Sequence, residues 1–214
     1  MTYKTRFQYL FDKATDIAQA ARASSPHGPR LPPLFFVTDP ARIRHPEDIA
    51  GHLPEGCGII YRHFGEPHAH ERARLLRRIS RDRGLVLLIG EDEALAADVE
   101  ADGVHLREHS LDRVPAVARP GWIVTAACHG AAALKRAETQ AGLSAVLISP
   151  VFASTSPSAH GVTPLGAKGA RALAEGASLP VIALGGITCD TVEQLHGCGL
   201  YGVAAVDAFK LEDV

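Results

Sequence analysis

The residues best suited to chemistry include two adjacent glycines, Gly185 and Gly186, which directly follow the apolar run Pro180–Leu184. Glycine lets backbone N–H groups approach an anion because no Cβ stands in the way. The next apolar run ends at Val206 and is followed by Asp207, and we expect the ends of the two runs to face the same point. These residues are therefore predicted to bind a phosphate group, and a plain tight turn is the alternative.

Two further side chains are predicted to be catalytic. Arg62 follows an apolar Gly-Ile-Ile-Tyr run, and a guanidinium group can hold a phosphate or pyrophosphate through two parallel hydrogen bonds. A surface ion pair with Glu66 is the alternative for this arginine. His129 also follows an apolar run and suits a general acid or base near neutral pH, or else it lies where the helical stretch 130–141 begins.

A long segment, residues 149–166, separates one apolar run from the next predicted helix. Long loops in compact domains are usually lids or binding loops, and Ser154, Thr155 and Ser156 offer hydroxyl groups for anion oxygens. A serine-rich linker is the alternative. Cys128, beside His129, has no thiolate-stabilising neighbour in the sequence, so an inert thiol is favoured over a nucleophile.

Short apolar runs separated by helical stretches must position these residues. Runs that are apolar throughout are typical of parallel strands covered by helices on the outside. The runs are Leu34–Thr38, Gly58–Arg62, Leu85–Ile89, Gly103–Leu106, Trp122–Ala126, Ala145–Ser149, Pro180–Leu184 and Gly202–Val206. The helical stretches are 68–82, 91–101, 111–118, 130–141, 166–176 and 190–197. Eight alternating units predict a single-domain α/β fold, the (β/α)8 TIM barrel, whose active site lies at the carboxyl ends of the strands.

The N-terminal segment stands apart from these repeats. Apolar residues recur at helical spacing over 3–23, and a proline-rich connector follows, so we divide the chain into 1–33 and a barrel over 34–214. The chain ends eight residues after the last apolar run, which leaves no room for an eighth helix. We therefore hypothesise that the helix over 3–23 packs where that helix would lie.

Composition limits the classes of partner. The formal net charge is −2 and 21% of the 214 residues are charged, which argues against nucleic acid or a membrane surface as the main partner. Neither a membrane span nor a signal peptide is evident, so we expect a cytoplasmic protein with its four cysteines as free thiols. His68 and His70 do not have the spacing of a zinc motif. Homo-oligomerisation stays open.

Several of these segments together resemble the thiamine phosphate synthase/TenI family from Leu34 to Val206. The matching pieces are FFVTD (35–39), Arg62, ADGVHL (101–106), His129, SPVF (149–152), PVIALGGI (180–187) and YGVAAV (201–206). For the synthases, the resemblance implies a barrel that couples hydroxymethylpyrimidine pyrophosphate with thiazole phosphate and releases pyrophosphate with the help of Mg²⁺.

The chain departs from the family pattern at several positions. Phe64 stands where the resemblance places a lysine, and Gly90-Glu91 stands where it places Asn-Asp, so that only Glu91 is left to meet a metal ion. The second metal aspartate corresponds to Ser110, and the lysine of the loop after strand 6 is lost at Pro157. Mg²⁺ binding is thereby disfavoured. Candidates for substitute cations are Arg42, Arg44 and Arg107.

Three functions are consistent with this pattern. The first is a thiamine phosphate synthase-like transferase of thiamine biosynthesis with altered catalytic positions. The second is a metal-free thiazole phosphate tautomerase-like isomerase with His129 as acid and base. The third is a non-catalytic binder of thiazole phosphate or thiamine phosphate. All three share a small phosphorylated heterocycle as partner.

Overall fold

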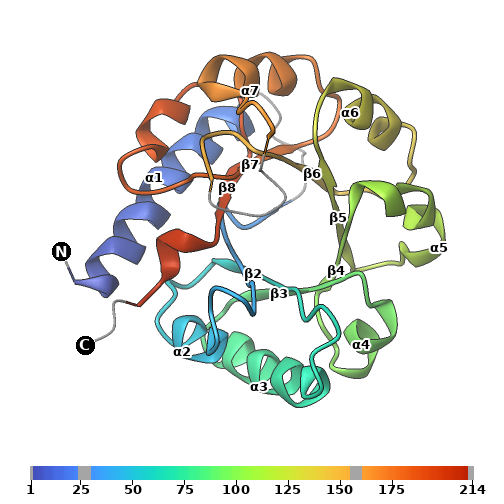
Figure 1. The fold of residues 1–214 in the computed structure, drawn as a ribbon. Helices are drawn as coiled ribbons and strands as arrows, with labels where there is room; N and C mark the ends of the chain where they lie inside the picture. Colours follow the sequence, from blue (N-terminus) through green and yellow to red (C-terminus); the bar gives the residue numbers. More distant parts are fainter. Residues whose placement is uncertain (1, 24–29, 155–160, 212–214) are drawn as a thin grey trace.

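Eight parallel strands close into a barrel in the computed structural model, which describes residues 2–23, 30–154 and 161–211 (Figure 1). The strands are β1 (Leu34–Val37), β2 (Gly58–Tyr61), β3 (Val86–Gly90), β4 (Gly103–Leu106), β5 (Ile123–Cys128), β6 (Ala145–Ile148), β7 (Val181–Leu184) and β8 (Gly202–Ala205). Each strand pairs with the next, and β8 pairs with β1. Because helices cover the outside and side chains fill the inside, most strand residues are buried, as the apolar runs predicted.

The helices follow the strands in a ring. They are α1 (Tyr3–Ala23), α2 (Pro46–Ala50), α3 (Ala69–Asp82), α4 (Glu93–Asp98), α5 (Val114–Val117), α6 (Ala131–Glu138) and α7 (Gly166–Glu175). Short 3₁₀ turns are η1 (Glu108–Arg113), η3 (Val192–Leu195) and η4 (Asp207–Phe209). The predicted barrel is therefore confirmed.

Some predicted helices were too long, and α2 was missed. α4 begins only after Asp92, whose side chain caps the helix by accepting a hydrogen bond from the Leu95 N–H at 2.8 Å. The stretch 111–118 divides into η1 and α5 because Pro115 has no N–H to continue a helix. The segment 190–197 forms only the turn η3. α2 is five residues long, too short for helical periodicity to show.

The N-terminal helix occupies the place of the missing eighth helix, as hypothesised. The Phe7 ring of α1 packs on Phe209 with 5.0 Å between ring centroids, and Phe209 packs on Phe36 of β1 at 5.2 Å. Figure 1 shows α1 in the ring of helices beside β8. Phe7, Leu10, Ala14 and Ile17 are buried along the face that α1 turns to the barrel, so this helix belongs to the core.

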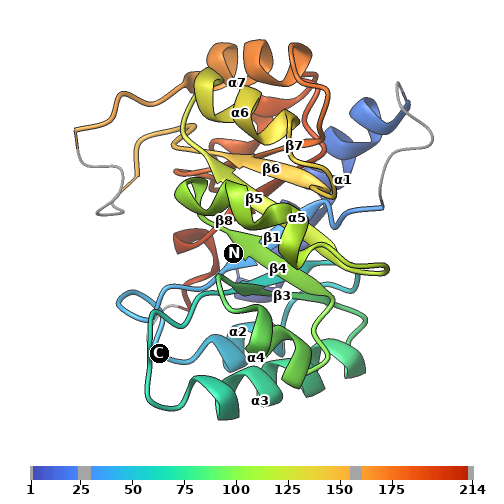
Figure 2. The ribbon, with the colours of Figure 1, turned by 90° about the vertical axis from the view of Figure 1, so that its right-hand side faces the viewer.

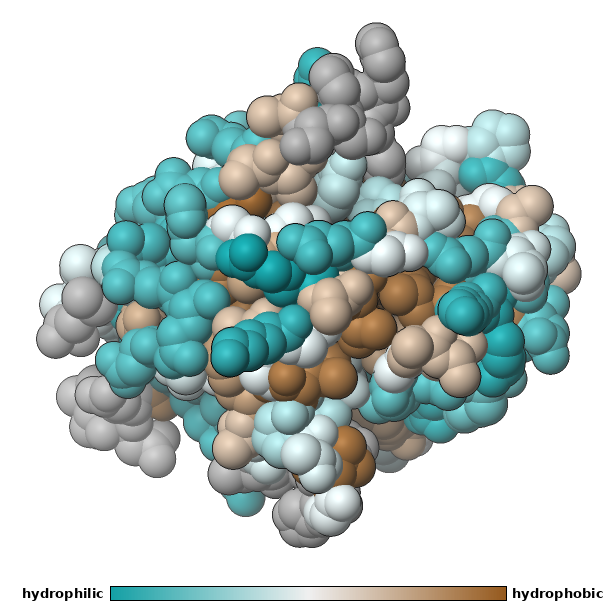
Figure 3. Space-filling view, turned by 90° about the horizontal axis from the view of Figure 1, so that it is seen from above, coloured by the Kyte–Doolittle hydropathy of each residue, from teal (hydrophilic) through white to brown (hydrophobic). Residues whose placement is uncertain are grey.

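The two ends of the barrel differ. Figure 2 shows the described residues that directly follow β6 at one end and the C-terminal end of α1 at the other. The side that α7 covers mixes hydrophilic and hydrophobic surface, and α7 buries only Ala170 completely (Figure 3).

Among the described residues, no helix is both long and apolar enough to cross a membrane.

Candidate functional site

A cavity of about 1230 Å³ opens at the carboxyl ends of the strands. Every strand or the residue after it contributes to the lining, through Val37, Arg62, Gly90, His105, Ala127, Ser149, Leu184 and Ala205. The cavity lies where barrel enzymes place their active sites, and it receives most of the residues predicted from the sequence.

Gly185 and Gly186 line the cavity at the end of β7. Their φ angles are 99° and 64°, and a Cβ on Gly186 would lie 2.4 Å from the carbonyl oxygen of Ala153. Within the described residues, the backbone N–H groups of Gly186 and Ile187 donate to no protein acceptor. The segment is thus both a tight turn packed against the β6 loop and a pair of donors at the cavity wall.

Asp207, after β8, does not present an uncompensated carboxylate to this wall. Its Oδ2 lies 2.9 Å from Nη1 of Arg42, and its Oδ1 lies 2.8 Å from Nζ of Lys210. Val206, the other residue predicted here, also lines the cavity. Two cations thus accompany the carboxylate next to the predicted phosphate site, so the local charge at the β8 end is not set by Asp207 alone.

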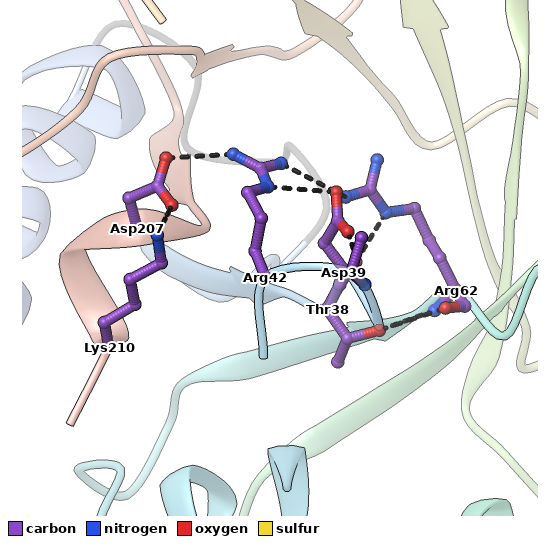
Figure 4. Close-up of polar contacts among 7 residues, drawn as sticks. Thr38, Asp39, Arg42, Arg62, Asp207 and Lys210 are labelled. Carbon is purple, nitrogen blue, oxygen red and sulfur yellow. Dashed lines mark hydrogen bonds and ion pairs between the residues drawn. The ribbon is translucent and has the colours of Figure 1, made fainter. Parts of the chain in front are cut away.

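Arg62 points into the cavity from the end of β2. Its Nε donates to the carbonyl of Thr38 at 2.7 Å, and Nη2 lies 3.7 Å from Oδ2 of Asp39 (Figure 4). Burial lowers the pKa of Arg62 to about 10, against an opposing effect of Asp39, so the group stays protonated near neutral pH. The surface pair with Glu66 is absent, since Glu66 binds Arg72 at 2.9 Å.

The carboxylate of Asp39 holds this group, a role that was not predicted from the sequence. Oδ2 of Asp39 accepts hydrogen bonds from Nε and Nη2 of Arg42 at 3.0 and 2.9 Å. Asp39 follows β1 directly, so its place at a strand end was the available signal. Of the three candidate arginines, Arg42 and Arg107 line the cavity, whereas Arg44 is exposed outside it.

His129 is fixed by a carboxylate. Oε2 of Glu108 lies 2.8 Å from Nδ1 of His129 and accepts the His129 backbone N–H at 2.8 Å. Partial burial raises the pKa of Glu108, but the hydrogen bonds from His129 outweigh it and hold this pKa below its ordinary value. These two contacts fix the position of the His129 ring, which does not cap α6, because the N-cap of that helix is Gly130. Nothing in the sequence except its negative charge indicates that Glu108 would contact His129.

His105, on β4, forms part of the lining. It is 7% exposed, and its Nδ1 lies 2.9 Å from Oγ1 of Thr125. Burial, helped by the charge of Arg62, lowers the pKa of His105 to about 3. The imidazole of His105 is therefore neutral near neutral pH, and it contributes a polar but uncharged group to the cavity.

Glu91, the predicted metal carboxylate, has its oxygens engaged by other groups. Oε2 accepts from Oγ of Ser110 at 2.8 Å and from Nη1 of Arg113 at 3.3 Å, and Oε1 accepts from the backbone N–H of Arg107. Mg²⁺ needs oxygen ligands in near-octahedral geometry. The described residues contain no group of three side chains suited to a metal ion. This donor set does not fit Mg²⁺.

The remaining candidate residues are the three hydroxyl residues of the loop after β6 and Cys128. Ser154 lines the cavity, whereas Thr155 and Ser156 lie outside the described residues. The thiol of Cys128 is buried, and burial raises its pKa to about 12, in agreement with an inert thiol. All four cysteines are free.

Comparisons with known proteins identify the family of the chain. Residues 34–209 match the family described as thiamine monophosphate synthase. A thiamine-phosphate synthase of Herpetosiphon aurantiacus is 30% identical over 82% of this chain and 87% of its own length. An Aquifex aeolicus protein, provisionally named thiamine-phosphate synthase 2, is 31% identical over 84% of this chain and 98% of its own length.

A solved structure supports the same assignment of the fold. The thiamine phosphate pyrophosphorylase of Pyrococcus furiosus superposes with a TM-score of 0.68 at 23% identity, covering 85% of this chain and 89% of the other. The family match spans every strand of the barrel and all of the described cavity lining except Lys210. The chain belongs to the thiamine monophosphate synthase/TenI family.

Proposed function

We propose that the protein is a transferase of thiamine biosynthesis that couples thiazole phosphate with hydroxymethylpyrimidine pyrophosphate. The observation that carries this proposal is that one cavity holds two separate groups of hydrogen-bond donors suited to anions. Backbone N–H groups of Gly186 and Ile187 line it at β7, and guanidinium groups line it at β2 and after β4. In a closed barrel of eight strands, β7 lies opposite β3, and β2 and β4 are the two neighbours of β3. The N–H groups at β7 and the guanidinium groups at β2 and after β4 therefore face each other across the opening.

The chemistry then follows from the charges. The N–H groups at β7 would hold the thiazole phosphate, and the arginines across the cavity would hold the pyrophosphate. Positive charge near the departing pyrophosphate stabilises the developing anion, which is the difficult part of this displacement. Arg62 is suited to this task because burial beside Thr38 and Asp39 fixes its guanidinium before substrate arrives.

The test is a direct assay of both products. The two substrates should yield thiamine phosphate and pyrophosphate in equal amounts. Arg62→Ala should lower kcat about 10²–10³-fold, the usual effect of removing one preorganised donor. Arg44→Ala, which removes an exposed arginine outside the cavity, is the matched control and should leave the rate unchanged. Absence of both products at high enzyme concentration would exclude the transferase.

A second candidate function rests on a different observation, the contact between Glu108 and His129. A histidine held at Nδ1 by a carboxylate keeps Nε2 for proton transfer on a bound thiazole ring. A tautomerase would interconvert thiazole phosphate isomers, followed by NMR, and His129→Asn should slow it about 10²–10⁴-fold with unchanged ligand affinity. If neither reaction occurs and thiazole phosphate still binds, the protein is a binder.

A further inference from the structure

Phe64 has an unusual position for an aromatic side chain. It is 55% exposed at the cavity, and its φ of 48° lies in the left-handed region, which bulky residues rarely adopt. The guanidinium carbons of Arg62 and Arg107 lie over its ring, 5.3 and 5.6 Å from the centroid. One aromatic ring therefore contacts two cations that come from different strand ends.

Both guanidinium groups keep donors for a ligand. Neither terminal nitrogen of Arg62 donates a hydrogen bond to a described residue, and Nη2 is buried. Figure 4 shows its other terminal nitrogen directed away from Asp39 and Thr38. Among the described residues, the guanidinium of Arg107 forms no hydrogen bond or ion pair, and it lies over the ring of Phe64. Two forked donor groups with unused N–H bonds match the oxygens of a diphosphate.

The neighbouring carboxylate cannot recruit a divalent cation to the same place. Glu91 already receives the guanidinium of Arg113 and the hydroxyl of Ser110 on Oε2. Arg113 also pairs with Glu93, so its charge bridges two carboxylates. The cation beside Glu91 is therefore part of the protein itself.

We propose that this chain binds a diphosphate group without a divalent metal ion, on Arg62 and Arg107, with Phe64 as the positioning residue that holds the two guanidinium groups. The proposal rests on the proposed function in assigning this group to the pyrimidine substrate. The site itself depends only on the described contacts, so it can be tested with inorganic pyrophosphate alone.

The first experiment measures pyrophosphate binding to the full chain by calorimetry, once with EDTA and once with excess Mg²⁺. The affinity in EDTA should equal or exceed that in Mg²⁺, because free pyrophosphate carries more charge for the arginines. Binding that appears only when Mg²⁺ is present would overturn the proposal.

The second experiment compares variants in EDTA. Arg62→Ala and Arg107→Ala should each weaken pyrophosphate binding about tenfold or more, the effect of losing charge-assisted hydrogen bonds. Phe64→Leu should weaken it about two- to fivefold, and Phe64→Tyr should restore it because the stacking ring returns. Arg119→Ala is the matched control, since Arg119 also stacks on an aromatic ring, Trp122 at 3.7 Å, but lies outside the cavity.

A third measurement separates this proposal from the proposed function. Lys210→Glu places negative charge at the β8 end and should weaken thiazole phosphate binding while leaving pyrophosphate binding unchanged. If instead Lys210→Glu abolishes pyrophosphate binding and Arg107→Ala does not, the diphosphate occupies the β7–β8 end and the proposal is wrong. If pyrophosphate fails to bind while both substrates still react, the transferase stands and only the arginine site is refuted.

Discussion

The two sides of the cavity are built by different means. The glycine side, Gly185 to Ile187, offers backbone N–H groups whose direction is set by left-handed glycines. The arginine side, formed by Arg62 and Arg107 with Phe64, offers side chains whose direction is set by contacts with other side chains. At the glycine side, an added Cβ would clash with the neighbouring backbone. At the arginine side, the position of each guanidinium group depends on the side chains that contact it. The two sides should therefore fail in different ways when they are mutated.

The largest effect is expected on the glycine side. Gly186→Ala adds a Cβ at 2.4 Å from the carbonyl oxygen of Ala153 and leaves a non-glycine residue at a φ of +64°. Left-handed strain and overpacking together should lower the free energy of unfolding by roughly 2–5 kcal/mol, measured by urea denaturation. Gly121→Ala is the control: its φ is +83° with nothing within 4 Å of the added Cβ, so strain alone should cost about 1–2 kcal/mol. Equal losses would show that the β6 loop does not confine Gly186.

The position of the glycine side was predictable from the sequence, whereas its binding of phosphate stays a prediction. Its signal is local, because two adjacent glycines follow an apolar run that β7 confirms as a strand. The barrel was predictable for a similar reason, since each apolar run is a short local pattern, and only the short or proline-interrupted helices were misjudged.

The arginine side was predicted only in part. Arg62 ends a strand and was found, but its partners come from distant positions. Arg42 binds Asp207, 165 residues away, and no pattern in one sequence pairs two such residues. From the sequence, Phe64 was described only as the residue that replaces a lysine of the family pattern. Its contacts with Arg62 after β2 and Arg107 after β4 depend on the order of strands in the barrel, because β3 lies between these two strands.

The next effect concerns the carboxylate on the arginine side. Asp39→Asn removes the negative charge that two largely buried guanidinium groups share, those of Arg42 and Arg62. Hydrogen bonds to charged groups contribute about 1.5–3 kcal/mol, so the free energy of unfolding should fall by roughly 2 kcal/mol. Asp98→Asn is the control, because Asp98 pairs with Arg74 at an exposed surface and should cost at most about 1 kcal/mol. A loss at Asp39 no greater than at Asp98 would mean that the arginine side does not depend on this carboxylate.

The smallest effect is a pH dependence of the free energy of unfolding, which reports whether water reaches His105 in the cavity near Arg62. The pKa of His105 is about 3 in the folded protein and about 6.5 when the chain is unfolded, so below pH 6.5 the unfolded chain binds a proton that the folded chain does not. The free energy of unfolding should therefore fall as the pH drops from 6 to 5, by at most about 1.4 kcal/mol from this group. His105→Asn, which keeps a polar group near Thr125, should reduce that slope. Equal slopes in the two proteins would show that water reaches His105. The surroundings of the arginine side would then be too polar to strengthen the attraction between its guanidinium groups and an anion.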